Sequence, residues 1–235
     1  MVRPILKIAS RQSDLARLQT ETVAAAILKK FPDLKIELHF RASLGDQNQN
    51  DPLWKMPEKG VFTEDFYQDL VTEKVDLVVH SWKDLPIEPK PDTEIVATLA
   101  REDQRDLFLF KSDRLPEVGQ LKSMKVLTSS PRRSYNLEEF FKDYFPVEIT
   151  KSSFLNVRGN ILTRLKKLIA EDVDGLIVAK AALDRLLASS DKQYANSQKE
   201  IRAILKKCRW MCLPLTLNPS AAAQGALAIE AKRNS

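Results

Sequence analysis

Short apolar segments with the spacing of strands alternate with amphipathic segments along the whole chain. Residues 5–10 predict a buried strand, and a helix follows from Ser13 to just before Pro32, with apolar positions at helical spacing. Further strands are predicted at 35–40, 76–82, 94–100, 106–110, 125–130, 147–150, 175–180 and 226–232. Further helices are predicted to begin at Thr63, Pro131, Asn160 and Ala181. Polar residues 191–198 are expected to form a loop before a last helix that carries Ile201, Leu205 and Cys208 on one face.

This alternation predicts an α/β fold. Strands that alternate with helices favour mostly parallel sheets covered by helices. Two such units are expected side by side, with a break near Arg101. No repeat of fixed period interrupts the pattern.

Composition narrows the class of protein. The chain has 235 residues, of which 43% are apolar and 29% charged, as in globular proteins. Its apolar runs are far shorter than the roughly 20 residues of a membrane helix, and its start does not resemble a secretory signal. Two cysteines and two histidines predict neither a disulfide framework nor a metal site. These observations favour a cytoplasmic protein. A net charge of +5 indicates an anionic partner, which could be nucleic acid, a membrane or a small molecule.

Three predicted strand–turn–helix junctions carry arginines and hydroxyl groups. The free N–H groups of a helix start bind anions, and arginine matches carboxylate or phosphate with two parallel donors. In α/β sheets such turns gather at the carboxyl ends of the strands. The residues are Arg11 and Ser13 at the first junction, Ser129, Ser130, Arg132 and Arg133 at the second, and Arg158, Asn160 and Arg164 at the third. They indicate either a cleft for a ligand with several negative groups or a solvated basic face. Neither GxGxxG nor GxxxxGK[ST] occurs, which favours carboxylates over a nucleotide.

The segment VVHSWKDLP places His80, Lys83 and Asp84 at the end of a predicted strand. A carboxylate beside a lysine at this point could serve as a general acid–base group or stabilise a cation. The alternative is a surface turn with a local ion pair.

Together these segments resemble the porphobilinogen deaminase (hydroxymethylbilane synthase) family. The motifs that match occur in the family's order: IASRQSDLARLQ, LGDQ, KGVFTEDFYQDL, VDLVVHSWKDLP, REDQRDLF, TSSPRR, VRGNILTRLKKL, DGLIVAKAALDRL and AAAQGALAIEAK. The resemblance covers nearly the whole chain. It implies an enzyme that joins four porphobilinogen molecules head to tail, with loss of ammonia, in tetrapyrrole and haem biosynthesis.

The resemblance also implies the architecture. Two domains like type II periplasmic binding proteins are expected, with a cleft between them: residues 1–100 plus 222–235, and residues 101–221. The family's third α/β domain, whose cysteine in a Gly-Gly-Cys context anchors a dipyrromethane cofactor, is expected to be absent. No Gly-Gly-Cys occurs, and Cys208 and Cys212 do not match the anchor. The dipyrromethane is therefore expected to be held without a covalent bond or to be missing.

Site roles follow from the resemblance, residue by residue. Asp84, next to Lys83, would stabilise the cation formed as ammonia leaves and would then help to remove a proton from the coupled ring. Lys55 and Lys59 would lie on a loop over the cleft. The remaining residues matched to substrate or cofactor binding are Arg11, Ser13, Gln19, Ser129, Arg132, Arg133, Arg158, Arg164 and Arg185.

Three functional hypotheses stay open at this point. The first is an active, shortened deaminase that acts on porphobilinogen and linear oligopyrroles. The second is a non-catalytic or partner-dependent protein that binds pyrroles or other polycarboxylates. The third, nucleic-acid binding, rests on charge alone and has no supporting motif, so neither nucleic acid nor membrane is expected as a partner. A homodimer that covers the surface left by the missing domain is a further hypothesis.

Overall fold

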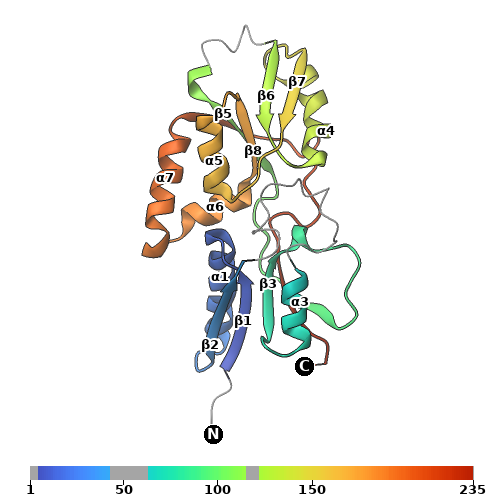
Figure 1. Cartoon of the computed structure of the whole chain (residues 1–235), viewed down its shortest axis with the longest axis vertical. Coiled ribbons are helices and arrows are strands. Elements are labelled where there is room, and N and C mark those ends of the chain that lie inside the picture. Colours follow the sequence, from blue (N-terminus) through green and yellow to red (C-terminus); the bar gives the residue numbers. More distant parts are fainter. Residues whose placement is uncertain (1–4, 43–62, 115–121, 235) are drawn as a thin grey trace. The chain divides into compact units, whose positions relative to one another are not determined.

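The computed structural model describes residues 5–42, 63–114 and 122–234 (Figure 1). The chain forms two compact units. Unit 1 comprises Met1–Glu102 with Ala223–Ser235, and unit 2 comprises Asp103–Ala222. The chain therefore leaves unit 1 after Glu102 and returns to it at Ala223.

Unit 1 is built on a five-stranded sheet with the strand order β2-β1-β3-β10-β4. Its elements are β1 (Ile5–Arg11), α1 (Asp14–Lys30), β2 (Lys35–Arg41), α3 (Glu64–Val71), β3 (Leu77–Ser81), the 3-10 turn η2 (Trp82–Asp84), β4 (Thr93–Ala97) and β10 (Leu227–Lys232). β1 is parallel to β2 and β3, whereas β10 is antiparallel to both of its neighbours. The last strand of the chain is thus inserted between β3 and β4.

Unit 2 repeats this plan, with the strand order β7-β6-β8-β5-β9. Its strands are β5 (Asp106–Lys111), β6 (Ser123–Leu127), β7 (Lys151–Leu155), β8 (Gly175–Ala179) and β9 (Cys208–Cys212). Its helical segments are α4 (Pro131–Glu139), the π-helical η4 (Phe140–Tyr144), α5 (Ile161–Ala170), α6 (Lys180–Ala188), η5 (Lys192–Tyr194) and α7 (Ala195–Leu205). β6 is parallel to β7 and β8, and β5 is antiparallel to β8 and β9. Two mixed sheets of this kind confirm the expected α/β class of two units.

Alternating side chains explain how the sheet of unit 1 is covered on both faces. Successive residues of a strand point to opposite faces. On β1, the buried Ile8 packs in one cluster with Val23 of α1, whereas its neighbour Ala9 packs in another with Phe66 and Leu70 of α3. The two helices therefore cover opposite faces of the sheet, and apolar core residues pack each of them against it.

Unit 2 is organised around an aromatic core. β5 is buried on both faces, as expected for a strand with a continuous apolar run. Phe108 of β5 lies 5.2 Å from Phe141 of η4, ring centre to ring centre, in an edge-to-face arrangement. Phe145 completes the cluster at 5.4 Å from Phe141.

The structure corrects two predicted elements at the edges of the unit 2 sheet. Residues 147–150 are not a strand, and β7 begins only at Lys151. As an edge strand β7 pairs with β6 alone and needs few apolar residues, so its sequence KSSFL lacks a clear signal. Cys208 does not lie on a helix, because α7 ends at Leu205 and Cys208 begins β9. Its burial, at 3% exposure, agrees with a structural role.

The predicted loop at 191–198 is also wrong. Asp191 accepts a hydrogen bond from the backbone N–H of Gln193 and starts the turn η5, from which α7 continues. Tyr194 is buried and fixes this turn against the unit. The polar composition of this segment did not reveal the turn capped by Asp191 or the helix that follows it.

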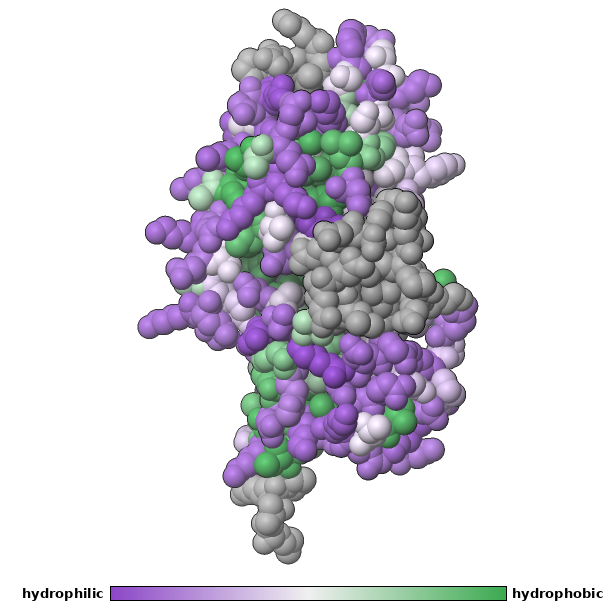
Figure 2. All heavy atoms as spheres, in the orientation of Figure 1, coloured by the Kyte–Doolittle hydropathy of each residue, from purple (hydrophilic) through white to green (hydrophobic). Residues whose placement is uncertain are grey.

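The face of the molecule in Figure 2 is mostly hydrophilic, with smaller apolar patches in both units. Exposed apolar side chains include Ile87, Val96 and Trp210. Within the described residues, no helix has the length and apolar character needed to cross a membrane.

Candidate functional site

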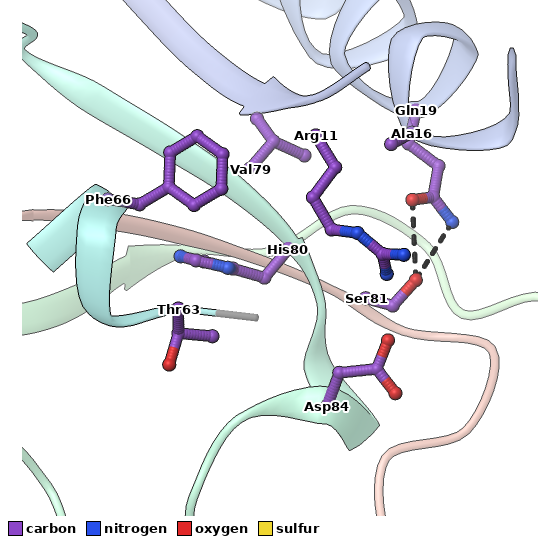
Figure 3. Close-up of a pocket in the computed structure, with 9 residues that line it drawn as sticks. All are labelled: Arg11, Ala16, Gln19, Thr63, Phe66, Val79, His80, Ser81 and Asp84. Atoms are coloured by element: carbon purple, nitrogen blue, oxygen red, sulfur yellow. Dashed lines mark hydrogen bonds between the residues drawn. The ribbon is translucent and has the colours of Figure 1, made fainter. Parts of the chain in front are cut away.

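A pocket in unit 1 lies where β1 and β3 end and α1 begins. Its lining residues are Arg11, Ala16, Gln19, Thr63, Phe66, Val79, His80, Ser81 and Asp84 (Figure 3). Because β1 and β3 are parallel, their carboxyl ends meet at one edge of the sheet, where ligands bind in α/β folds. In Figure 3 the guanidinium of Arg11 and the carboxylate of Asp84 point toward one another, with Ser81 beside them.

The predicted helix start at Ser13 is confirmed. The Ser13 hydroxyl accepts a hydrogen bond of 3.4 Å from the backbone N–H of Ala16. Gln19, one turn further along α1, is buried and exchanges hydrogen bonds of 3.2 and 3.3 Å with the Ser81 hydroxyl. Gln19 thus joins α1 to the end of β3, close to both Arg11 and Asp84.

Lys83 and Asp84 lie on the 3-10 turn that follows β3, and both side chains are exposed. The Lys83 ammonium group donates a 3.2 Å hydrogen bond to the side-chain oxygen of Gln224, which is buried just before β10. The turn is fixed by a hydrogen bond from the Trp82 N–H to the carbonyl of Ala226. The return of the chain to unit 1 therefore holds the turn that carries Asp84.

Beneath this turn lies a buried polar cluster of His80, Glu230 and Thr93. His80 Nε2 is 2.8 Å from one carboxylate oxygen of Glu230, and the Thr93 hydroxyl donates a 2.5 Å hydrogen bond to the other. Burial raises the pKa of Glu230, but the hydrogen bond and charge of His80, helped by Thr93, keep that pKa below its ordinary value. The sequence gives no signal for this partnership, since His80 and Glu230 lie 150 residues apart.

In unit 2, the start of α4 matches its prediction. The Ser130 hydroxyl accepts a hydrogen bond from the backbone N–H of Arg133, and Pro131 occupies the first helical position. The two arginines that follow do not both reach solvent: the side chain of Arg132 is 25% exposed and that of Arg133 is 8% exposed. Both donate to the carboxylate of Asp106 at the start of β5.

Ser129 connects the second and third junctions. Its hydroxyl donates a hydrogen bond to the carbonyl of Val157 and accepts one of 2.9 Å from the Val157 N–H. The Thr128 N–H also donates to the carbonyl of Leu155. Since the only hydrogen of the Ser129 hydroxyl is donated to Val157, it offers no donor to a carboxylate in this structure.

Replacing Ser129 with alanine is expected to lower the free energy of unfolding by about 2 kcal/mol, because two polar backbone groups of the buried Val157 lose their partner. Urea unfolding measures the change. Ser190→Ala, which alters an exposed serine, serves as the matched control. Unchanged stability together with weaker binding of porphobilinogen would instead make Ser129 a direct ligand contact.

The third junction presents the start of α5. Asn160 caps it by accepting a 2.9 Å hydrogen bond from the Thr163 N–H, as predicted. Gly159 has a φ of 108°, and a Cβ there would lie 2.7 Å from the Thr163 side chain, so the turn requires glycine. The Arg164 Nε–H donates to the Gly159 carbonyl at 2.8 Å, and Arg158 is buried in the same turn.

The other predicted site residues are Arg185, Lys55 and Lys59. Arg185 is half-buried near the end of α6. Lys55 and Lys59 lie outside the described residues, so their place over a cleft stays a prediction. Thr63 precedes α3 as expected, but its side chain makes no capping hydrogen bond.

Neither cysteine has the surroundings of a reactive thiol. Both lie on β9, and burial raises the pKa of each thiol. A raised pKa lowers the thiolate fraction and therefore the reactivity. Within the described residues, no group of three or more histidines, cysteines or carboxylates could hold a metal ion.

Three carboxylates with lowered pKa values predict that the fold is sensitive to acid. They are Asp103 (pKa about 2, with Arg105 as its main partner), Asp106 and Glu230. Each stabilises the fold above the pKa of its unfolded form, 3.8 for aspartate and 4.5 for glutamate, and this contribution is lost as the pH falls through the lower folded pKa. Urea unfolding between pH 7 and pH 2 should therefore show stability falling below about pH 4.5. Asp103→Asn should flatten the lower part of this profile, and an unchanged profile would contradict the assignment.

Comparison with known proteins identifies the family of this chain. The family described as "Porphobilinogen deaminase, dipyromethane cofactor binding domain" matches residues 6–235. The porphobilinogen deaminase of Ruminiclostridium josui is 36% identical over 181 residues, covering 77% of this chain and 57% of that protein. Those of Caldicellulosiruptor saccharolyticus and Clostridioides difficile are 37% and 32% identical, covering 83% and 97% of this chain and 64% and 67% of theirs.

Among solved structures, a periplasmic sulfonate-binding protein from Methylobacillus flagellatus is similar, with a TM-score of 0.49, 12% identity, and coverage of 99% of this chain and 62% of that one. The chain spans 57% of the length of the R. josui relative. Because the family match extends over residues 6–235 and the relatives exceed 30% identity, the chain belongs to the porphobilinogen deaminase family.

Proposed function

We propose that this chain acts as a hydroxymethylbilane synthase, joining four porphobilinogen molecules head to tail with loss of ammonia. The observation that carries the proposal is the pocket of unit 1, in which Asp84 faces Arg11 at the carboxyl ends of β1 and β3. A carboxylate and a guanidinium in one pocket suit a substrate that develops positive charge on a ring and carries carboxylates around it.

Asp84 has two tasks in this proposal. The bond from carbon to the protonated amino group of porphobilinogen breaks, ammonia leaves with the electron pair, and the positive charge passes to the ring system. The fixed negative charge of Asp84 stabilises that cation. After the methylene carbon has bonded to the next pyrrole, the coupled ring loses its proton, which Asp84 helps to remove.

Cations and helix starts hold the acetate and propionate groups of the rings. In unit 1 the assigned groups are Arg11, Ser13 and Lys83, and in unit 2 they are Arg132, Arg158, Arg164 and Arg185. Arginine forks and the capped starts of α1, α4 and α5 are suited to carboxylates. We assign Gln19 to positioning, because its amide is engaged with Ser81.

The same donor set fits a dipyrromethane cofactor, which carries two rings of the substrate's kind. When bound, dipyrromethane supplies the free ring position at which chain growth begins. Arg11 and Asp84 would hold it at the pocket of unit 1, the guanidinium on a carboxylate and the carboxylate near the pyrrole N–H groups. With Cys208 buried and the pKa of both thiols raised, we assign the holding of this group to ion pairs rather than to either cysteine.

The decisive experiment incubates the purified chain with porphobilinogen and measures uroporphyrin absorbance after acid oxidation. The proposal is supported if the wild type forms product and Asp84→Ala does not. Glu94→Ala, which alters an exposed carboxylate on β4, serves as the control and should form product like the wild type. Protection against thermal unfolding by porphobilinogen without any product would favour the second candidate, a pyrrole-binding or partner-dependent protein.

A further inference from the structure

Asp106 is a fully buried carboxylate that no sequence motif singled out as functional. It opens β5, and its exposed fraction is 0%. Arg132 Nη2 donates to it at 2.8 Å, Arg133 Nε and Nη2 donate at 3.0 and 2.6 Å, and the Asn218 amide donates at 3.0 Å. Burial raises the pKa of Asp106, but the charge and hydrogen bonds of Arg133, followed by those of Arg132 and Asn218, outweigh it and leave the pKa well below its ordinary value.

The two arginines use this carboxylate in different ways. Arg133 gives it two donors, and its third nitrogen, Nη1, lies 3.4 Å from the carbonyl of Ile177 in the centre of the sheet. All three nitrogens of Arg133 are thus engaged inside the unit. Arg132 gives Asp106 only Nη2, and its side chain keeps contact with solvent.

Asn218 also restricts the orientation of the Arg132 guanidinium. Its side-chain oxygen accepts a 3.3 Å hydrogen bond from Arg132 Nη1, while its amide nitrogen donates to Asp106. The Pro219 carbonyl accepts a second hydrogen bond from the same Nη1. The buried Asn218 therefore bridges Asp106 and Arg132, so that the guanidinium is held from two sides.

A count of charges separates the roles further. The carboxylate of Asp106 faces the guanidinium groups of Arg132 and Arg133, so these three residues together carry one excess positive charge. A buried charge must be compensated by an opposite charge close to it. Arg133, whose side chain is buried beside Asp106, provides this compensation. The excess charge then belongs to the partly exposed Arg132, at the capped start of α4.

We propose that Asp106 is a positioning residue, which keeps Arg133 as an internal counter-ion and orients Arg132 as the guanidinium that meets a ligand carboxylate. This inference rests on the proposed function. It departs from the equal roles that the family resemblance implies for Arg132 and Arg133.

Stability and binding are tested first, on the full chain with porphobilinogen as the probe. Arg133→Lys should lower Tm by about 10 °C, because lysine keeps the positive charge but cannot supply the paired donors that the buried carboxylate receives from Arg133 Nε and Nη2. Arg132→Gln should change Tm by no more than about 2 °C and weaken porphobilinogen binding roughly 30-fold, as measured by calorimetry. Lys199→Gln, which removes an exposed cation of α7, controls for net charge. The reverse pattern, with Arg133→Lys stable but weak in binding, would overturn the proposal.

Arginine side-chain NMR of the wild type avoids any variant that fails to fold. The Arg133 Nε–H signal should exchange slowly with water and stay in place when porphobilinogen is added, whereas the Arg132 signals should shift. Fast exchange at Arg133 Nε would overturn the proposal even if porphobilinogen did not bind at all. A failure of the proposed function and a failure of this inference therefore give different results.

A double-mutant cycle tests whether Asp106 acts through Arg132. Asp106→Asn should weaken porphobilinogen binding several-fold in the wild type and have almost no effect in the Arg132→Gln background. A purely structural Asp106 would give the same loss in both backgrounds, and that result would overturn the positioning role.

Discussion

The substitution Asp84→Asn is expected to slow the turnover of porphobilinogen by about 10²- to 10³-fold while leaving its binding and the stability of the chain almost unchanged. The substitution keeps the shape of the side chain and one acceptor oxygen but removes the negative charge and the ability to accept a proton. Both proposed tasks of Asp84 depend on those two properties. Since Asp84 is exposed on a 3-10 turn and its backbone is held by the elements around it, the fold loses little.

Single-turnover rates with enzyme in excess separate the chemical step from substrate binding. Glu94→Gln, the same chemical change on β4, should match the wild type in rate and binding. Asp84→Glu should recover part of the rate, since it restores the charge at a displaced position. A rate for Asp84→Asn within a factor of about three of the wild type would remove Asp84 from the proposed chemistry.

Local signals account for the parts of the site that could be predicted. Ser13, Ser130 and Asn160 cap their helices as expected, because a cap is decided by a side chain and a backbone N–H three residues away. The Arg11 and Asp84 positions follow from the ends of two buried strands, each recognisable from its own apolar run.

Most parts of the site that could not be predicted depend on polar partners that lie far apart in the sequence. Asn218 meets Asp106 across 112 residues, and Glu230 meets His80 across 150. A buried carboxylate at the end of a strand looks the same in the sequence whether its partner is a ligand, solvent or another strand. For the same reason the TSSPRR segment predicts one role for both of its arginines, whereas in the structure Arg133 is buried against Asp106.

The edge strands β7 and β9 could not be predicted from the sequence for a different reason. β7 and β9 pair with one neighbour only, so half of their surroundings stay polar and their sequences lack the apolar run of a central strand. The expectation of mostly parallel sheets does not specify which strand of each sheet is antiparallel. In both units it is the first strand after the chain crosses over: β5 in unit 2 and β10 in unit 1.

Glu230 should be the residue whose loss damages unit 1 most. Glu230→Ala leaves His80 Nε2 and the Thr93 hydroxyl, both buried, without their shared acceptor and is expected to cost about 3–5 kcal/mol in the free energy of unfolding. Turnover should fall as well, because His80 immediately precedes the segment that carries Lys83 and Asp84. Glu94→Ala, an exposed glutamate on the strand next to β10, should cost no more than about 0.5 kcal/mol.

The pH dependence distinguishes loss of this charge from loss of packing. Glu230→Gln keeps the size of the side chain and one acceptor, so it should cost less than Glu230→Ala at pH 7. Since the folded pKa of Glu230 lies below 4.5, its stabilising contribution is fully present above pH 4.5 and is lost as the pH falls through the folded value. The stability difference between wild type and Glu230→Gln should therefore shrink in acid, measured by urea unfolding at a series of pH values. A difference that stayed constant down to pH 3 would mean that shape rather than charge gives Glu230 its effect.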